Sequence, residues 1–128
     1  MGQRLGVGMT YIAGLEPAFA EVIDLLDVIE VEPQTFWLAD PSSAPDASRP
    51  RYRIDREAMA RIAALPQAKL LHSVSLPVGS VRAPDSAQVD LVAMLCEELG
   101  AAWVSEHLAF NQAHGPKGPF VTGFFLPP

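Results

Sequence analysis

Short apolar segments alternate with helix-like segments along the chain, and this alternation limits the fold more than any other feature. Strands are expected over residues 4–11, 28–31, 69–76 and 101–110, and helices over 16–26, 56–65 and 86–100. Strands that are apolar on nearly every position are typical of parallel sheets, whose connections run through helices. The pattern therefore predicts an α/β fold with parallel strands and about four βα units.

Local signals mark where these helices begin and end. Pro17 suits a first helical turn, and Asp55 and Asp85 are suited to cap the helices that follow them. Gly100 is placed to end the third helix. Residues 38–53, rich in Pro, Ser, Ala and Asp, are expected to form one long loop, and residues 111–128 a turn-rich and then apolar tail.

The number of units suggests part of a barrel. Four βα units are half of a TIM-like (β/α)8 barrel, which needs about 250 residues, whereas this chain has 128. We therefore expect residues 1–128 to form a single α/β domain that is the N-terminal half of a longer TIM-like barrel. A doubly wound open sheet is the structural alternative.

Composition excludes several classes of protein. The net charge of -6 argues against a nucleic-acid partner, because phosphate binding needs a basic surface. No segment reaches the roughly 18 apolar residues of a membrane span, and the N-terminus lacks the pattern of a secretory signal. A single cysteine, Cys96, excludes an internal disulfide and a cysteine-rich zinc site. A cytoplasmic location is the default expectation.

Polar side chains gather toward the ends of the predicted strands. Glu30 and Glu32 lie on one face of the second strand by period-two alternation, His72 lies late in the third, and Glu106 and His107 lie in the fourth. Parallel α/β proteins place ligands at the carboxyl ends of their strands. Carboxylates and imidazoles that converge there are better tolerated around a cation, and this donor set suits iron, manganese or zinc. We therefore predict a metal site.

Structural alternatives exist for each of these residues. A lone His72 is more often a hydrogen-bonded core residue than a ligand, Glu30 can pair with a basic neighbour, and Glu32 can point into solvent. Glu106 and His107 face opposite sides of an ideal strand, so both can be ligands only if the strand bulges or ends there. Trp37 either packs in the core or walls a pocket.

Four motifs also resemble a known family. They are "GVGMTY", "DVIEVEPQTFW", "LLHSVSLPVGS" and "VSEHLAF", in matching order over nearly the whole chain. Together they resemble the N-terminal motifs of the bacterial domain-of-unknown-function family numbered 692, whose studied members are multinuclear iron-dependent oxidases with a TIM-barrel-like fold. That family includes the methanobactin-biosynthesis oxidase, which modifies cysteines of a ribosomally made peptide with the help of a partner protein.

The resemblance implies roles for particular residues. His72, Glu106 and His107 would match or adjoin metal-site positions, and Glu30 an acidic position of the second-strand motif. We ourselves expect Glu32, Gln34 and Trp37 to line the substrate site. Two positions depart from the family pattern, because Ala13 stands about where a histidine is common and Gln34 begins the pair that is often Glu-Asn.

The expected function is that of an iron-dependent oxidase-like protein acting on a peptide or another thiol-containing substrate, with a multinuclear iron site or another divalent metal. The expected partners are a second protein and a ribosomally made peptide, and a homo-oligomer is expected if the chain is complete. One alternative is another metal-dependent TIM-barrel enzyme, a sugar isomerase or phosphodiesterase. The other is a non-catalytic scaffold or peptide-binding protein without metal.

Overall fold

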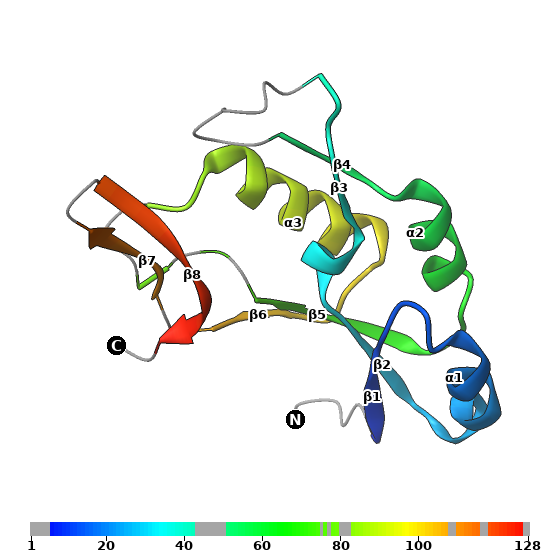
Figure 1. Cartoon of the computed structure of the whole chain (residues 1–128). Coiled ribbons are helices and arrows are strands. Elements are labelled where there is room, and N and C mark those ends of the chain that lie inside the picture. Colours follow the sequence, from blue (N-terminus) through cyan, green and yellow to red (C-terminus); the bar gives the residue numbers. More distant parts are fainter. Residues whose placement is uncertain are drawn as a thin grey trace.

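The computed structural model describes residues 6–42, 51–74, 76, 78–79 and 83–107, and the backbone of 110–115 and 118–126. Figure 1 shows the elements in space. In chain order they are β1 (Gly8–Tyr11), α1 (Glu16–Val22), the 3-10 turn η1 (Ile23–Leu25), β2 (Val28–Val31), the 3-10 turn η2 (Pro33–Phe36), β3 (Trp37–Ala39), β4 (Tyr52–Ile54), α2 (Arg56–Ala63), β5 (Ala68–Ser73), α3 (Ser86–Glu98), β6 (Val104–Glu106), β7 (Phe110–Gly115) and β8 (Gly118–Leu126).

The centre of the fold is a four-stranded sheet in the order β1-β2-β5-β6, with every neighbouring pair parallel. Each new strand is added beside the previous one, and α1, α2 and α3 occupy the three connections. The parallel α/β fold predicted from the alternating pattern is confirmed. The close approach of β1 to β2 needs a glycine, because a Cβ on Gly8 would lie 2.2 Å from a side-chain methyl of Val28.

The two faces of this sheet differ. Ile29, Val31 and Leu71 alternate onto one face and are fully buried, and they join a core with Met59 of α2 and Leu95 of α3. We call this the helix-covered face. Figure 1 shows α2 and α3 above β5 and β6 on this side. Alternation sends the intervening residues to the opposite face.

That opposite face, here called the polar face, carries Thr10, Glu30, Leu70, His72 and Ser105. The register pairs Thr10 with Glu30, Glu30 with Leu70, and His72 with Ser105, and paired residues of parallel strands point the same way. All five are half-buried. The strand register therefore brings most of the polar side chains expected from the sequence onto one surface.

The expected helix signals are confirmed. Asp55 accepts a hydrogen bond from the Ala58 N–H at 3.0 Å, and Asp85 accepts one from the Ala87 N–H at 2.9 Å. Pro17 lies in the first turn of α1, and Gly100 follows α3 with φ of 58°. None of the described helices is long and apolar enough to cross a membrane.

The prediction of one long loop over residues 38–53 is partly wrong. Trp37–Ala39 and Tyr52–Ile54 pair as the antiparallel strands β3 and β4, with Trp37 opposite Ile54. Figure 1 shows this arm rising away from the sheet. Residues 43–50 lie outside the described residues. The turn-forming composition of the segment concealed the pairing, because each strand has only three residues.

The C-terminal part also differs from expectation. The fourth sheet strand is Val104–Glu106, shorter than the expected 101–110, and β7 and β8 then form an antiparallel hairpin in place of a turn-rich tail. The described residues form an open four-stranded sheet and do not close into a barrel.

Replacing Lys69 tests how much the burial of its charge in the core costs in stability. This side chain is buried on the helix-covered face, where its ammonium donates to the Leu65 carbonyl, and burial lowers the pKa of Lys69 below its ordinary value of 10.5. We expect Lys69→Met to raise the free energy of unfolding at pH 7 by about 1 kcal/mol, because no charge then has to be desolvated. Urea denaturation measures this change.

The difference in the free energy of unfolding between Lys69→Met and wild type should shrink as pH rises toward 10.5. Between the lowered folded pKa of Lys69 and this ordinary value, the unfolded wild-type chain binds more protons than the folded one, so wild-type stability rises with pH. Arg61→Met is the control, since Arg61 is exposed and its ion pair with Glu57 lies on the surface of the same helix. An unchanged or lower stability of Lys69→Met at pH 7 would contradict the cost of burying this charge.

Candidate functional site

Two imidazoles meet where β5 and β6 end. His72 lies next to last in β5, and His107 directly follows β6. Their Nε2 atoms are 3.0 Å apart, and their ring centroids are 4.8 Å apart at an interplanar angle of 61°. Both rings are half-buried. The strand pairing of His72 with Ser105 explains the contact, because His107 lies two residues further along on the same side.

A hydrogen-bond chain orients the His72 ring. Its Nδ1 lies 2.8 Å from the Ser105 hydroxyl, and that hydroxyl lies 3.4 Å from the Leu71 carbonyl. If the hydroxyl donates to the carbonyl, its lone pair accepts from Nδ1–H. This assignment leaves the Nε2 lone pair of His72 directed toward His107. Partners of this kind commonly fix the tautomer of a metal-ligating histidine.

The spacing of the two Nε2 atoms fits two ligands of one metal ion. Nitrogen ligands lie about 2.1 Å from such a metal, so two that subtend a right angle would be about 3.0 Å apart. The observed separation is 3.0 Å. The same distance also fits one ring donating an N–H to the other. Across the described residues, no group of three or more His, Cys, Asp and Glu side chains is arranged to hold a metal.

Glu106 lies beside the pair but its carboxylate is engaged with backbone. One oxygen accepts the N–H of His107 at 2.7 Å, and the other accepts the N–H of Leu76 at 3.2 Å. The carboxylate thus ties the end of β6 to the segment that follows β5. Glu106 pairs with Ser73, whereas His72 pairs with Ser105, so alternation places Glu106 and His107 on opposite sides, as expected for neighbours in a strand.

Glu30 lies on the polar face in β2, the strand next to β5, which carries His72. Its carboxylate accepts a hydrogen bond from the Thr10 hydroxyl at 2.7 Å, so its partner is a hydroxyl and not the basic residue considered from the sequence. Both residues line a cavity of about 220 Å³ together with Gly8, Val28 and Leu70. Sequence reasoning missed Thr10, because its role follows only from the register that places it opposite Glu30.

The three residues expected to contact substrate have different surroundings. Gln34 uses its side-chain amide to bond Ser73 and the Val74 N–H. Trp37 packs against Tyr52 with ring centroids 5.4 Å apart, and its buried indole N–H has no partner among the described residues. Glu32 is half-buried, and its backbone carbonyl accepts from Thr35.

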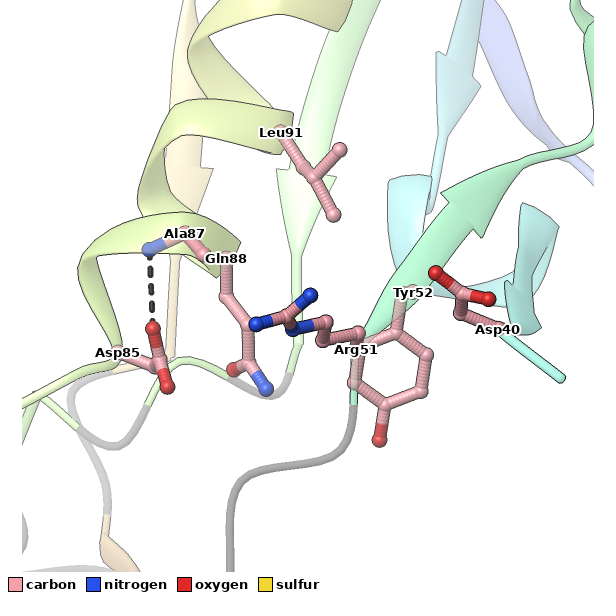
Figure 2. Close-up of a pocket in the computed structure, with 7 residues that line it drawn as sticks. All are labelled: Asp40, Arg51, Tyr52, Asp85, Ala87, Gln88 and Leu91. Carbon is pink, nitrogen blue, oxygen red and sulfur yellow. Dashed lines mark hydrogen bonds between the residues drawn. The ribbon is translucent and has the colours of Figure 1, made fainter. Parts of the chain in front are cut away.

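A larger cavity, of about 630 Å³, lies elsewhere, between the β3–β4 arm and the start of α3 (Figure 2). Figure 2 shows Arg51 extending toward Gln88 of α3. The backbone N–H and hydroxyl of Ser42 lower the pKa of Asp40 at its edge. The other lining residues are Tyr52, Asp85, Ala87 and Leu91. None of the predicted metal-binding or substrate-contacting residues lines this cavity, so volume alone does not identify the site.

Comparison with known proteins identifies the family. Residues 45–119, 75 of the 128 in the chain, match the family model described as RiPP precursor modification enzyme MbnB/TglH/ChrH, where RiPP denotes a ribosomally synthesised and post-translationally modified peptide. The chain belongs to this family. The matched segment contains His72, Glu106 and His107, whereas Glu30, Glu32, Gln34 and Trp37 precede it. No curated protein matches the chain.

Membership of the MbnB/TglH/ChrH family bears directly on the expected function. The family consists of enzymes that modify precursor peptides, which agrees with the peptide-modifying role expected from the sequence motifs. The family description names no metal, so the iron-dependent oxidase activity stays a prediction.

The orientation of His72 can be tested directly. We expect neutral His72 to carry its proton on Nδ1 in the wild-type chain. In Ser105→Ala the Nδ1 partner is lost, and the Nε2–H tautomer should gain population. The 15N chemical shifts of the two ring nitrogens distinguish these forms.

Ser42→Ala serves as the control, because the Ser42 hydroxyl bonds to Asp40 and lies in neither strand end. The same tautomer population in wild type and Ser105→Ala would show that Ser105 does not orient the ring.

Proposed function

We propose that this chain supplies part of the metal site of a cytoplasmic, iron-dependent enzyme that modifies a ribosomally made peptide or another thiol-containing substrate. The observation that carries this proposal is the His72–His107 pair, with Nε2 atoms 3.0 Å apart and the far nitrogen of His72 held by Ser105. Membership of a family of peptide-modifying enzymes supports the substrate class.

The side chains of the candidate site residues suit different roles. His72 and His107 would be the nitrogen ligands, and Glu106 and Glu30 would add carboxylate oxygens. Each carboxylate oxygen has two lone pairs, so the single hydrogen bond that each Glu106 oxygen accepts does not exclude coordination. Glu32 has no side-chain hydrogen bond among the described residues, which leaves its carboxylate available to a substrate.

Iron held by such oxygen and nitrogen ligands would supply dioxygen activation when bound. The chain's own residues would hold the ligands at the sheet edge and orient them. Ser105 fixes the ring of His72, and Glu106 fixes the backbone that carries His107.

We further propose that the polar face lines the interior of a TIM-like barrel. The sequential strand order β1-β2-β5-β6 and the packing of helices on one face support this arrangement. Further ligands would then come from strands that complete the barrel, and a partner protein or a second copy of the chain would bind outside it.

Metal content tests the proposal. The full-length protein, purified without oxygen, is expected to hold stoichiometric iron, and His72→Ala and His107→Ala are expected to reduce the iron to background because each removes a ligand. Elemental analysis gives the content, and mass spectrometry of a cysteine-containing precursor peptide encoded beside the gene gives the activity. His114→Ala, which alters the third histidine, is the matched control.

The outcomes separate the alternatives. Metal binding with activity on sugars and none on cysteine-containing peptides would indicate the isomerase type. No stoichiometric iron, together with unchanged peptide modification in Glu106→Ala, would indicate that the metal does not take part. Equal iron loss in His114→Ala would show that the binding is not specific to the pair.

A further inference from the structure

Gln34 reaches from η2 to the end of β5 with both polar atoms of its side chain. Its Nε2 donates to the Ser73 hydroxyl, and its Oε1 accepts the Val74 N–H at 3.3 Å. Ser73 is fully buried. These two residues directly follow His72, so the amide of Gln34 holds the backbone next to the imidazole pair.

The position of this contact follows from where the sheet ladder stops. The pairing of β2 with β5 ends at Val31 and Leu71, but β5 continues to Ser73. Pro33 cannot donate a backbone hydrogen bond, so β2 cannot extend in regular form along the rest of β5. The side chain of Gln34 takes the place of a strand there, with one acceptor for the Val74 N–H and one donor for Ser73.

β6 holds the end of β5 on the edge opposite to Gln34. Ser73 pairs with Glu106, and the carboxylate of Glu106 accepts the Leu76 N–H. The end of β5 is therefore fixed by Gln34 on the β2 side and by β6 on the other. Because Ser73 faces the helix-covered side, His72 is directed to the polar face, where it meets His107.

We propose that Gln34 is a positioning residue for the His72–His107 pair and not a substrate-contacting residue. Its amide keeps the end of β5 in the register that sets the two Nε2 atoms 3.0 Å apart. The effect on metal binding rests on the proposed function, whereas the effect on the distance between the rings does not.

Two substitutions separate hydrogen bonding from side-chain length. Gln34→Met keeps the length but cannot bond to Ser73 or Val74. Gln34→Glu keeps an acceptor for the Val74 N–H and can accept from the Ser73 hydroxyl, so it should rescue the arrangement. Gln67→Met is the matched control, because the side-chain amide of Gln67 also makes a long-range hydrogen bond, donated to the Ile23 carbonyl at 3.0 Å, away from the imidazole pair.

The experiment uses two measurements on the full chain. The first is the nuclear Overhauser effect between the ring protons of His72 and His107 in the metal-free protein. It should be lost in Gln34→Met and retained in Gln34→Glu and Gln67→Met. The second is affinity for Co²⁺ followed by its visible spectrum, which should fall by about 10–100-fold in Gln34→Met alone, as for other residues that orient ligands.

The melting temperature distinguishes positioning from general stability. Gln34→Met should lower it, since two side-chain hydrogen bonds are lost, and Gln67→Met should lower it less, since one is lost. Loss of the ring contact in Gln67→Met, or its retention in Gln34→Met, would overturn the proposal. If Gln34→Met does not fold, Ser73→Ala removes one of the two contacts and should weaken the ring contact; an unchanged ring contact in that variant would overturn it. Absence of Co²⁺ binding in the wild type would count against the metal site alone.

Discussion

The structure depends on the burial of one face of a parallel sheet. Ile29, Val31 and Leu71 are fully buried under α2 and α3, and this fixes the register of β2 and β5. A slip of one residue would send Glu30 and His72 into the core, where an unpaired carboxylate or imidazole is costly. The apolar contacts on the helix-covered face therefore also place the polar side chains on the opposite face.

The sequence predicted this architecture well where local and tertiary signals agree. The parallel sheet follows from apolar strands separated by helices, and Asp55, Asp85 and Gly100 mark helix boundaries by local chemistry that tertiary contacts do not alter. The meeting of His72 with His107 was predicted only as a common location at the strand ends. Its geometry required the pairing of β5 with β6.

The features that sequence reasoning missed depend on contacts between distant residues. The β3–β4 arm pairs two three-residue strands across a segment rich in turn-forming residues, and no periodicity is visible in so few positions. Thr10 gains its role because β1 aligns it with Glu30, which is 20 residues away. Gln34 was predicted to line the substrate site, whereas its bonds to Ser73 and Val74, which follow His72, depend on the fold and could not be predicted from local sequence.

At the edge where β5 and β6 end, side chains that bond to the backbone lie next to the candidate metal-binding imidazoles. Backbone donors beyond the last ladder bond still need partners, and in this chain side chains supply them: Gln34 bonds the Val74 N–H, and Glu106 bonds the Leu76 and His107 N–H groups. The same bonds fix the chain segments that carry the imidazoles. A group that satisfies the backbone at this edge therefore also sets the distance between His72 and His107, so local stability and site geometry depend on the same side chains.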